Sequence, residues 1–499
     1  MSLVTGLVSS LVTGLVPGTP RAESSQPGHS LADVIQSARL NNAGLAIAAE
    51  DLRSTQGALE AAAEPFDGAF VVDLAGNRAH SFGPTGSGQP LRATSGTATM
   101  SLSQRFRNGL TIGPEVTTST TRFETNGAEV ADVTDLSARF RIVLPLLQDR
   151  GGVVVAAGEQ AAAAEHLATR MEAQHAELIL IARVAQAYWA FAAADRRRVV
   201  LVASEERAMR TVAETAALVK ADERTGADLI QARGYESSRR TARIKAEQEV
   251  LAARLSVAAL TGVGGTSPLA SFSTTTPLPA VRPHMTGGDR IAAWMERAVE
   301  QRADIAAIDC RLRAAKIRLV ATKSAVSARL DLSVRAGYTT QSSGIAAFDD
   351  LPARAPGVDA MVGLTYQLPL AESGARGKIA QASSAVRRLE ISRAELVRRL
   401  RIDLAAAYEQ LKLTARGMSE SAEAVRLMER TVDSERRKFQ LGSSTLFAVN
   451  QAEDSLTAAL LGAIEETRAY AAAIATLRLE AGALRGSPAE IAAQLMGLE

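Results

Sequence analysis

Two long stretches without proline dominate this chain, residues 146–267 and 370–487. Both are rich in Ala, Leu, Arg and Glu, whose side chains lose little rotamer freedom on a helix. Each is interrupted by a short polar segment that contains a glycine, Asp222–Gly226 in the first and Leu441–Thr445 in the second. A glycine can end one helix in the left-handed conformation, and a nearby Ser or Thr can cap the next. Each stretch therefore predicts two long antiparallel helices joined by a tight turn.

The two stretches also resemble each other in register. Val184–Tyr188 matches Leu404–Tyr408, and Leu229–Ala232 matches Val449–Ala452, both 220 residues apart. Further matches lie upstream, between Asn42–Leu45 and Arg302–Ile305 and between Leu144–Leu146 and Leu368–Leu370. Repetition of this kind indicates an internal duplication. We therefore expect a first structural repeat over 23–262, a linker over 263–288, a second repeat over 289–482 and a short tail over 483–499.

The segments before the long helices change their period. Helical spacing predicts one helix over 31–64 and another over 289–325, after which apolar and polar residues alternate as in strands. Strands are expected within 68–146 in the first repeat and within 328–369 in the second. The polar segments 80–96, 124–136 and 341–357 are expected to be loops, and Asn108-Gly109 favours a hairpin.

The N-terminus repeats an apolar motif, Leu3–Val8 and Leu11–Val16. Its length fits the core of a signal peptide better than a membrane span, so residues 1–22 are expected to be a signal peptide. The fit is imperfect, because no Lys or Arg precedes the apolar run and Pro20 lies three residues before the end of a site at Ala22.

The composition argues against several classes of protein. The formal net charge is +2, which gives no reason to expect a nucleic-acid partner. Cys310 is the only cysteine, so the chain forms no internal disulfide, and the five histidines show no metal-binding spacing. Residues 374–378 lack the spacing and the Ser or Thr of a phosphate loop. We expect no catalytic residues, no metal and no cofactor, and an enzyme is the least favoured class.

The order of helix, strands, long helix, turn and return helix, given twice, resembles the TolC-like outer-membrane efflux proteins. The residues that carry the resemblance are Arg302–Ile305, Gly363-Leu364, Leu368–Leu370 with Gly374, and Arg437 through Gly442 to Ala452. The resemblance covers about residues 30–482. It implies a mainly α fold with β-strands, in which a homotrimer shares a transmembrane β-barrel and a long α-helical coiled-coil barrel. The tip of that barrel would meet a periplasmic adaptor and an inner-membrane pump.

The hydrogen-bonding needs of strands favour the same assembly. Four or six strands cannot close a barrel alone, and an open sheet edge would leave unpaired backbone groups in lipid. Apolar alternate residues would face outer-membrane lipid, and charged ones a water-filled lumen. The expected lumen residues are Arg105, Arg139, Arg141, Arg329 and Arg335 against Asp73, Asp331 and Asp359. This basic excess predicts a mild anion preference.

The leading hypothesis is a passive channel for small molecules or polypeptides in a tripartite efflux or type I secretion system. A structural periplasmic coiled-coil protein without channel activity is the alternative, which explains the helices but not the amphipathic strands.

The resemblance also assigns candidate sites at the helical tips. Leu441, Gly442 and Ser443 lie where the adaptor would dock, and Asp222 and Thr225 occupy the equivalent turn of the first repeat. Family members carry acidic gate residues at the positions of Ala448 and Gln451, so their absence here puts such a gate in doubt. Asp228, aligned with Ala448, is the candidate gate residue, and a simple helix cap is the other interpretation.

Overall fold

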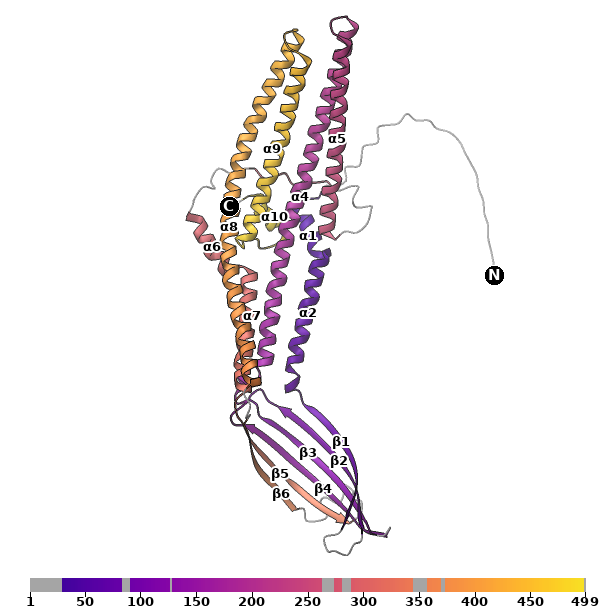
Figure 1. Cartoon of the computed structure of the whole chain (residues 1–499), viewed down its shortest axis with the longest axis vertical. Helices are drawn as coiled ribbons and strands as arrows, with labels where there is room; N and C mark the ends of the chain where they lie inside the picture. Colours follow the sequence, from indigo (N-terminus) through magenta and orange to yellow (C-terminus); the bar gives the residue numbers. More distant parts are fainter. Residues whose placement is uncertain are drawn as a thin grey trace, which may run out of the picture.

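The computed structural model describes residues 29–82, 90–125, 128–262, 273–280, 289–343, 357–368 and 373–497. The expected signal peptide and most of the linker lie outside these residues. The chain is elongated, with two helical hairpins at one end and a single sheet at the other (Figure 1).

The hairpins match the two proline-free stretches. The first consists of α4 (Ala157–Lys220) and α5 (Gly226–Thr261), and the second of α8 (Ser373–Gln440) and α9 (Leu446–Glu480). They lie beside each other along the long axis (Figure 1), and α4 also contacts α9. One window of α4 is apolar enough to cross a membrane, but 56% of it is buried inside the molecule, as in a core helix.

The two helices expected over 31–64 and 289–325 are each broken once. The first consists of α1 (Leu31–Asn41) and α2 (Ala43–Ala63), and the second of α6 (Asp289–Gln301) and α7 (Ala303–Ala325). The breaks lie at Asn42 and Arg302, which both adopt extended backbone conformations as N-caps. Three short helices complete the set: η1 (Glu64–Phe66), α3 (Gly152–Val155) and α10 (Pro488–Met496).

In the described part of the chain, six strands form one antiparallel sheet in chain order. The sequence left four or six strands open, and the described residues show six. The strands are β1 (Ala69–Phe82), β2 (Pro90–Arg105), β3 (Thr111–Thr125), β4 (Ala128–Pro145), β5 (Arg329–Ser343) and β6 (Gly357–Gln367). Asn108-Gly109 makes the expected hairpin, with Gly109 at φ 94°. Much of the expected loops 80–96 and 124–136 is strand instead, because their β-branched Thr and Val suit a pleated ladder although they blur the polar alternation.

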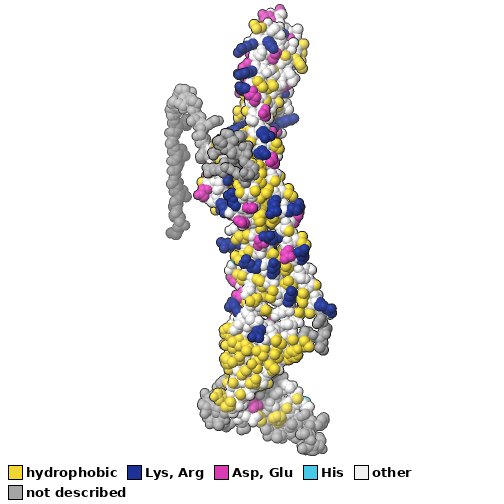
Figure 2. Space-filling model, turned by 90° about the vertical axis from the view of Figure 1, so that its left-hand side faces the viewer, with side chains coloured by type: hydrophobic (Ala, Val, Ile, Leu, Met, Phe, Trp, Pro, Cys, Tyr) yellow, Lys and Arg dark blue, Asp and Glu magenta, His cyan; other side chains and the backbone are white. Residues whose placement is uncertain are grey.

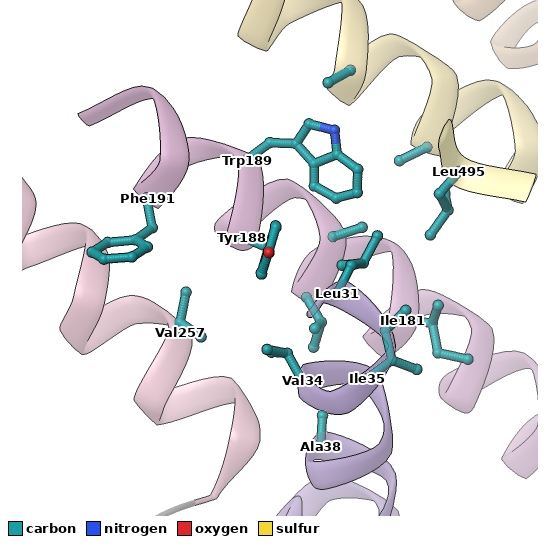
Figure 3. Packing of buried hydrophobic residues seen from close by; sticks show 14 of the residues in the cluster. Leu31, Val34, Ile35, Ala38, Ile181, Tyr188, Trp189, Phe191, Val257 and Leu495 are labelled. Atoms are coloured by element: carbon teal, nitrogen blue, oxygen red, sulfur yellow. The ribbon is translucent and has the colours of Figure 1, made fainter. Parts of the chain in front are cut away.

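The largest core lies midway along the helices. Leu31, Val34 and Ile35 of α1 pack against Ile181 and Tyr188 of α4, and Val257 of α5 completes the contact (Figure 3). The Tyr188 hydroxyl donates to the carbonyl oxygen of His29 at 3.0 Å.

Residues 483–499, expected to be a short tail, contain the helix α10. Leu484, Ile491 and Leu495 are buried in the same core, and Leu495 points toward α1 and α4 (Figure 3). Ser487 forms a capping box with Glu490 at the start of this helix. The C-terminal segment therefore helps to hold the helical region together.

Candidate functional site

In the part of the sheet nearer the helices, one face is apolar across all six strands. Directly paired residues of antiparallel strands share a face. One such row consists of Val72, Met100, Val116, Ala138, Tyr338 and Val358. Two rows nearer the helices contain Ile112, Ile142, Val334 and Val362, and then Leu144, Leu332 and Leu364. Several of these side chains are exposed, and hydrophobic atoms form a broad band over this end of the molecule (Figure 2). A patch this extended is typical of a membrane or protein contact.

The opposite face carries five arginines, and carboxylates hold three of them. At the end of the sheet far from the helices the first face is charged too, since Arg122 and Asp132 lie on it as an ion pair. Arg105 pairs with Asp149 at 3.2 Å and Arg329 with Asp331 at 2.6 Å. Arg139 donates to Asp359.

The remaining charged residues of this face are three carboxylates and two arginines. Asp73 lies in register with Thr99. Glu115 and Asp135 add two carboxylates, so the basic excess expected from the sequence is absent from the described strands as a whole. Arg141 and Arg335 lie directly opposite each other on β4 and β5.

The two helical turns have closely similar geometry. Gly442 has φ 72° and Asp222 has φ 57°, so each turn contains one left-handed residue. Thr445 and Thr225 cap the following helices with their hydroxyls. Leu441 is 83% exposed, and the Ser443 hydroxyl donates to the carbonyl oxygen of Lys438 at 3.1 Å. An exposed leucine beside a rigid turn fits a docking contact.

Asp228 takes part in a capping box. Its carboxylate accepts from the backbone N–H of Thr225 at 3.2 Å and from the Thr225 hydroxyl at 3.0 Å. This geometry explains the residue as a cap, and the gate role remains a prediction.

No protein-family model matches the sequence, and no curated protein matches it. Solved structures do match. The outer-membrane channel OprN superposes with a TM-score of 0.68 at 15% identity, over 92% of this chain and 90% of that one. VceC from Vibrio cholerae gives 0.67 at 18% identity over 91% and 96%, and CusC gives 0.67 at 16% over 94% and 99%. The chain has the TolC-like channel fold.

Within this TolC-like fold, a charged cluster near the tips joins the two hairpins. Glu453 of α9 is only 5% exposed. It accepts from Arg207 of α4 at 2.7 Å and from Arg436 of α8. A buried carboxylate is stable only when it is paired and hydrogen-bonded. Sequence analysis missed this cluster because Arg207 lies 246 residues from Glu453 in the chain and no sequence period relates the three residues.

A second contact lies beside it. The Tyr235 hydroxyl of α5 donates to Asp454 of α9 at 2.8 Å, and Arg239 pairs with the same carboxylate at 3.0 Å. Burial and this hydrogen bond raise the pKa of Tyr235 above its ordinary value. The phenol therefore stays protonated, and it connects α5 to α9.

A third missed group surrounds the helix break at Arg302. This guanidinium donates to Asp304 at 3.0 and 2.8 Å and to the Glu480 carboxylate at 2.5 Å. His175 of α4 lies 3.7 Å from Asp304, beside a cavity of about 370 Å³. Burial lowers the pKa of His175, although Asp304 acts in the opposite direction. The sequence match between Arg302–Ile305 and the first repeat pointed to this segment. It did not predict that Arg302 would bind Glu480 at the end of α9.

The break at Asn42 holds the first hairpin in a corresponding way. Its side-chain amide donates to the carbonyl oxygen of Leu260 at 2.8 Å, and its oxygen accepts from the Gly44 N–H at 2.9 Å. Across the described part of the chain, no group of three or more His, Cys, Asp or Glu could hold a metal ion.

Proposed function

We propose that the protein is the outer-membrane channel of a tripartite efflux or type I secretion system. It would act as a passive channel, with energy supplied by an inner-membrane pump. The observation that carries this proposal is the apolar band on one face of the six-stranded sheet (Figure 2). The register places Arg139, Arg141 and Arg335 on the opposite face. The structural neighbours OprN and VceC are described as outer-membrane proteins, which supports the same location.

The open sheet favours a homotrimer. Among the described strands, β1 and β6 each pair on one side only. Unpaired backbone groups cost several kcal/mol each in lipid, so β1 of one copy would pair with β6 of the next. Three copies would then close an 18-stranded barrel, an even number in the range of known outer-membrane barrels.

The helices offer a matching contact surface. Ile391, Ile402 and Leu413 are exposed on α8 at intervals of eleven residues, which is close to three helical turns. They form one apolar stripe along the helix, and a neighbouring copy would cover it. The duplicated design would give the trimer two similar hairpins per copy, arranged around a tunnel.

The tips would meet the periplasmic adaptor. Leu441, Gly442 and Ser443 form the exposed turn of the second hairpin, with Asp222 and Thr225 in the first. A turn fixed by backbone and cap hydrogen bonds presents Leu441 without a large ordering cost, which favours docking there.

Crosslinking tests the assembly. In a Cys310→Ser background, Val72→Cys on β1 and Val362→Cys on β6 place thiols on the two edge strands. A short bismaleimide added to outer membranes should give dimers and trimers on denaturing gels. Val116→Cys on the interior strand β3 is the control and should give monomers. Monomers from the edge variant as well would contradict the shared barrel.

Conductance then tests the channel. The detergent-extracted trimer should produce discrete conductance steps in planar bilayers, with the size expected of a continuous water-filled pore. A stable trimer that gives no conductance would support the structural coiled-coil alternative.

A further inference from the structure

Two arginines on the charged face of the sheet have no acidic partner among the residues that the structure describes. Arg141 on β4 pairs in register with Arg335 on β5. Their Cα atoms are therefore about 4.5–5.5 Å apart, with both side chains on the same face. Among the described residues, no hydrogen bond or ion pair engages either one, whereas Arg105, Arg139 and Arg329 each have a carboxylate.

The neighbours in the same row carry no charge. Gly113 of β3 pairs with Arg141, and Met361 of β6 pairs with Arg335. The nearest carboxylates in the register lie in the next row, at Glu115 and Asp359. Asp359 already accepts from Arg139, and Glu115 lies opposite Arg139 in register. Like charges directly opposite each other destabilise a sheet, so this row is a local concentration of positive charge.

We propose that Arg141 and Arg335 form an oxyanion-binding site for solutes that carry a phosphate or carboxylate group. The inference rests on the proposed channel, in which this face lines the lumen and three copies place three such pairs at one level. Guanidinium groups bind these oxyanions through paired N–H donors, and an anion between the two arginines removes their repulsion. The other described charges of this face are three arginines against five carboxylates, so anion selectivity would arise at this level and not along the whole barrel.

Phosphate block of chloride current tests the site. With inorganic phosphate added to wild-type channels in planar bilayers, chloride current should fall in a concentration-dependent way. Arg141→Gln with Arg335→Gln should raise the half-blocking concentration at least about tenfold, the factor expected from losing one charged hydrogen bond. The same variant should shift the reversal potential in a salt gradient toward cation preference.

The control removes the same charge elsewhere. Arg53→Gln with Arg387→Gln deletes two exposed arginines from α2 and α8, and block and reversal potential should stay as in wild type. Wild-type channels that phosphate does not block, or equal block in the Arg141 and Arg335 variant, would overturn the inference while leaving the channel function intact.

A second measurement does not depend on conductance. Phenylglyoxal modifies accessible arginines, and mass spectrometry of the detergent-solubilised protein locates the modified residues. Phosphate should protect Arg141 and Arg335 at least several-fold more than Arg53. If the protein does not conduct, the channel proposal fails, and the protection pattern alone then decides the anion site. Equal protection at all three arginines would refute it.

Discussion

Arg139 on β4 reaches across β5 to Asp359 on β6, and the residue between them in the register is Gly337. A side chain at this place would lie in the path of the guanidinium. The backbones are also close, because a Cβ atom on Gly337 would lie 2.1 Å from the carbonyl oxygen of Ala138. Gly337 therefore permits both the close strand contact and the ion pair that joins β4 to β6.

Gly337→Ala should destabilise the sheet. The new methyl group has to displace backbone atoms of β4, and such overpacking typically costs about 1–3 kcal/mol. Thermal unfolding of the purified protein, followed by loss of its β-sheet signal, measures the effect. Gly76→Ala is the matched control, because its Cβ atom would meet nothing within 4 Å. Equal unfolding temperatures for the two variants would contradict this account.

Leu441→Asp should abolish export and leave the protein folded and assembled. The side chain is 83% exposed, so its loss costs little stability, while a charge would oppose an apolar docking contact. Export of a known substrate of the partner pump, measured at equal expression, checks the result. Ile230→Asp, at a side chain 75% exposed on α5, is the comparison for the first hairpin. Normal export by Leu441→Asp would exclude this turn as the docking point.

Asp228→Asn separates the gate role from the cap role. An amide oxygen can still accept from Thr225, so the cap survives while the negative charge is lost. If three Asp228 carboxylates form a gate, divalent cations added from the periplasmic side should block the Asp228→Asn channel less than the wild-type channel. Asp228→Ala should in addition lose about 1 kcal/mol of stability, because it removes the cap. Unchanged block in Asp228→Asn trimers would rule out the gate and leave only the cap.

Glu453→Ala should loosen the contact between the hairpins. It leaves Arg207 without its carboxylate in a largely buried place, and breaking such a pair costs about 3–5 kcal/mol. Helix unfolding in denaturant, followed by circular dichroism, gives the change in free energy. Glu395→Ala removes an acid whose partners Arg398 and Arg399 are exposed on one helix, so it should cost far less.

His175 predicts a pH dependence in the helical region. Burial lowers its pKa below the ordinary value of 6.5, so the folded protein holds the neutral imidazole while the unfolded chain takes up a proton more readily. Stability from this group is therefore present above about pH 6.5 and is lost as the pH falls through the lowered pKa. His175→Gln should show a shallower decline in unfolding free energy between pH 7 and 5. A slope identical to that of wild type would show that the histidine does not contribute.

The sequence by itself determined the long helical hairpins, their tight turns and the alternation of the strands. These features are local, because helix propensity, a glycine turn and strand alternation each depend on residues that are close together in the sequence. The apolar face of the sheet follows from the same alternation, because Phe70, Val72 and Leu74 lie two residues apart in the sequence.

Only the tertiary structure decided which distant side chains meet. The helix breaks at Asn42 and Arg302 are held by Leu260 and Glu480, at the far ends of the return helices. Glu453 finds Arg207 only after two hairpins pack side by side. The opposition of Arg141 and Arg335 depends on register between strands from different halves of the chain. Propensity cannot encode such contacts, because their energy comes from burial and charge pairing between segments hundreds of residues apart.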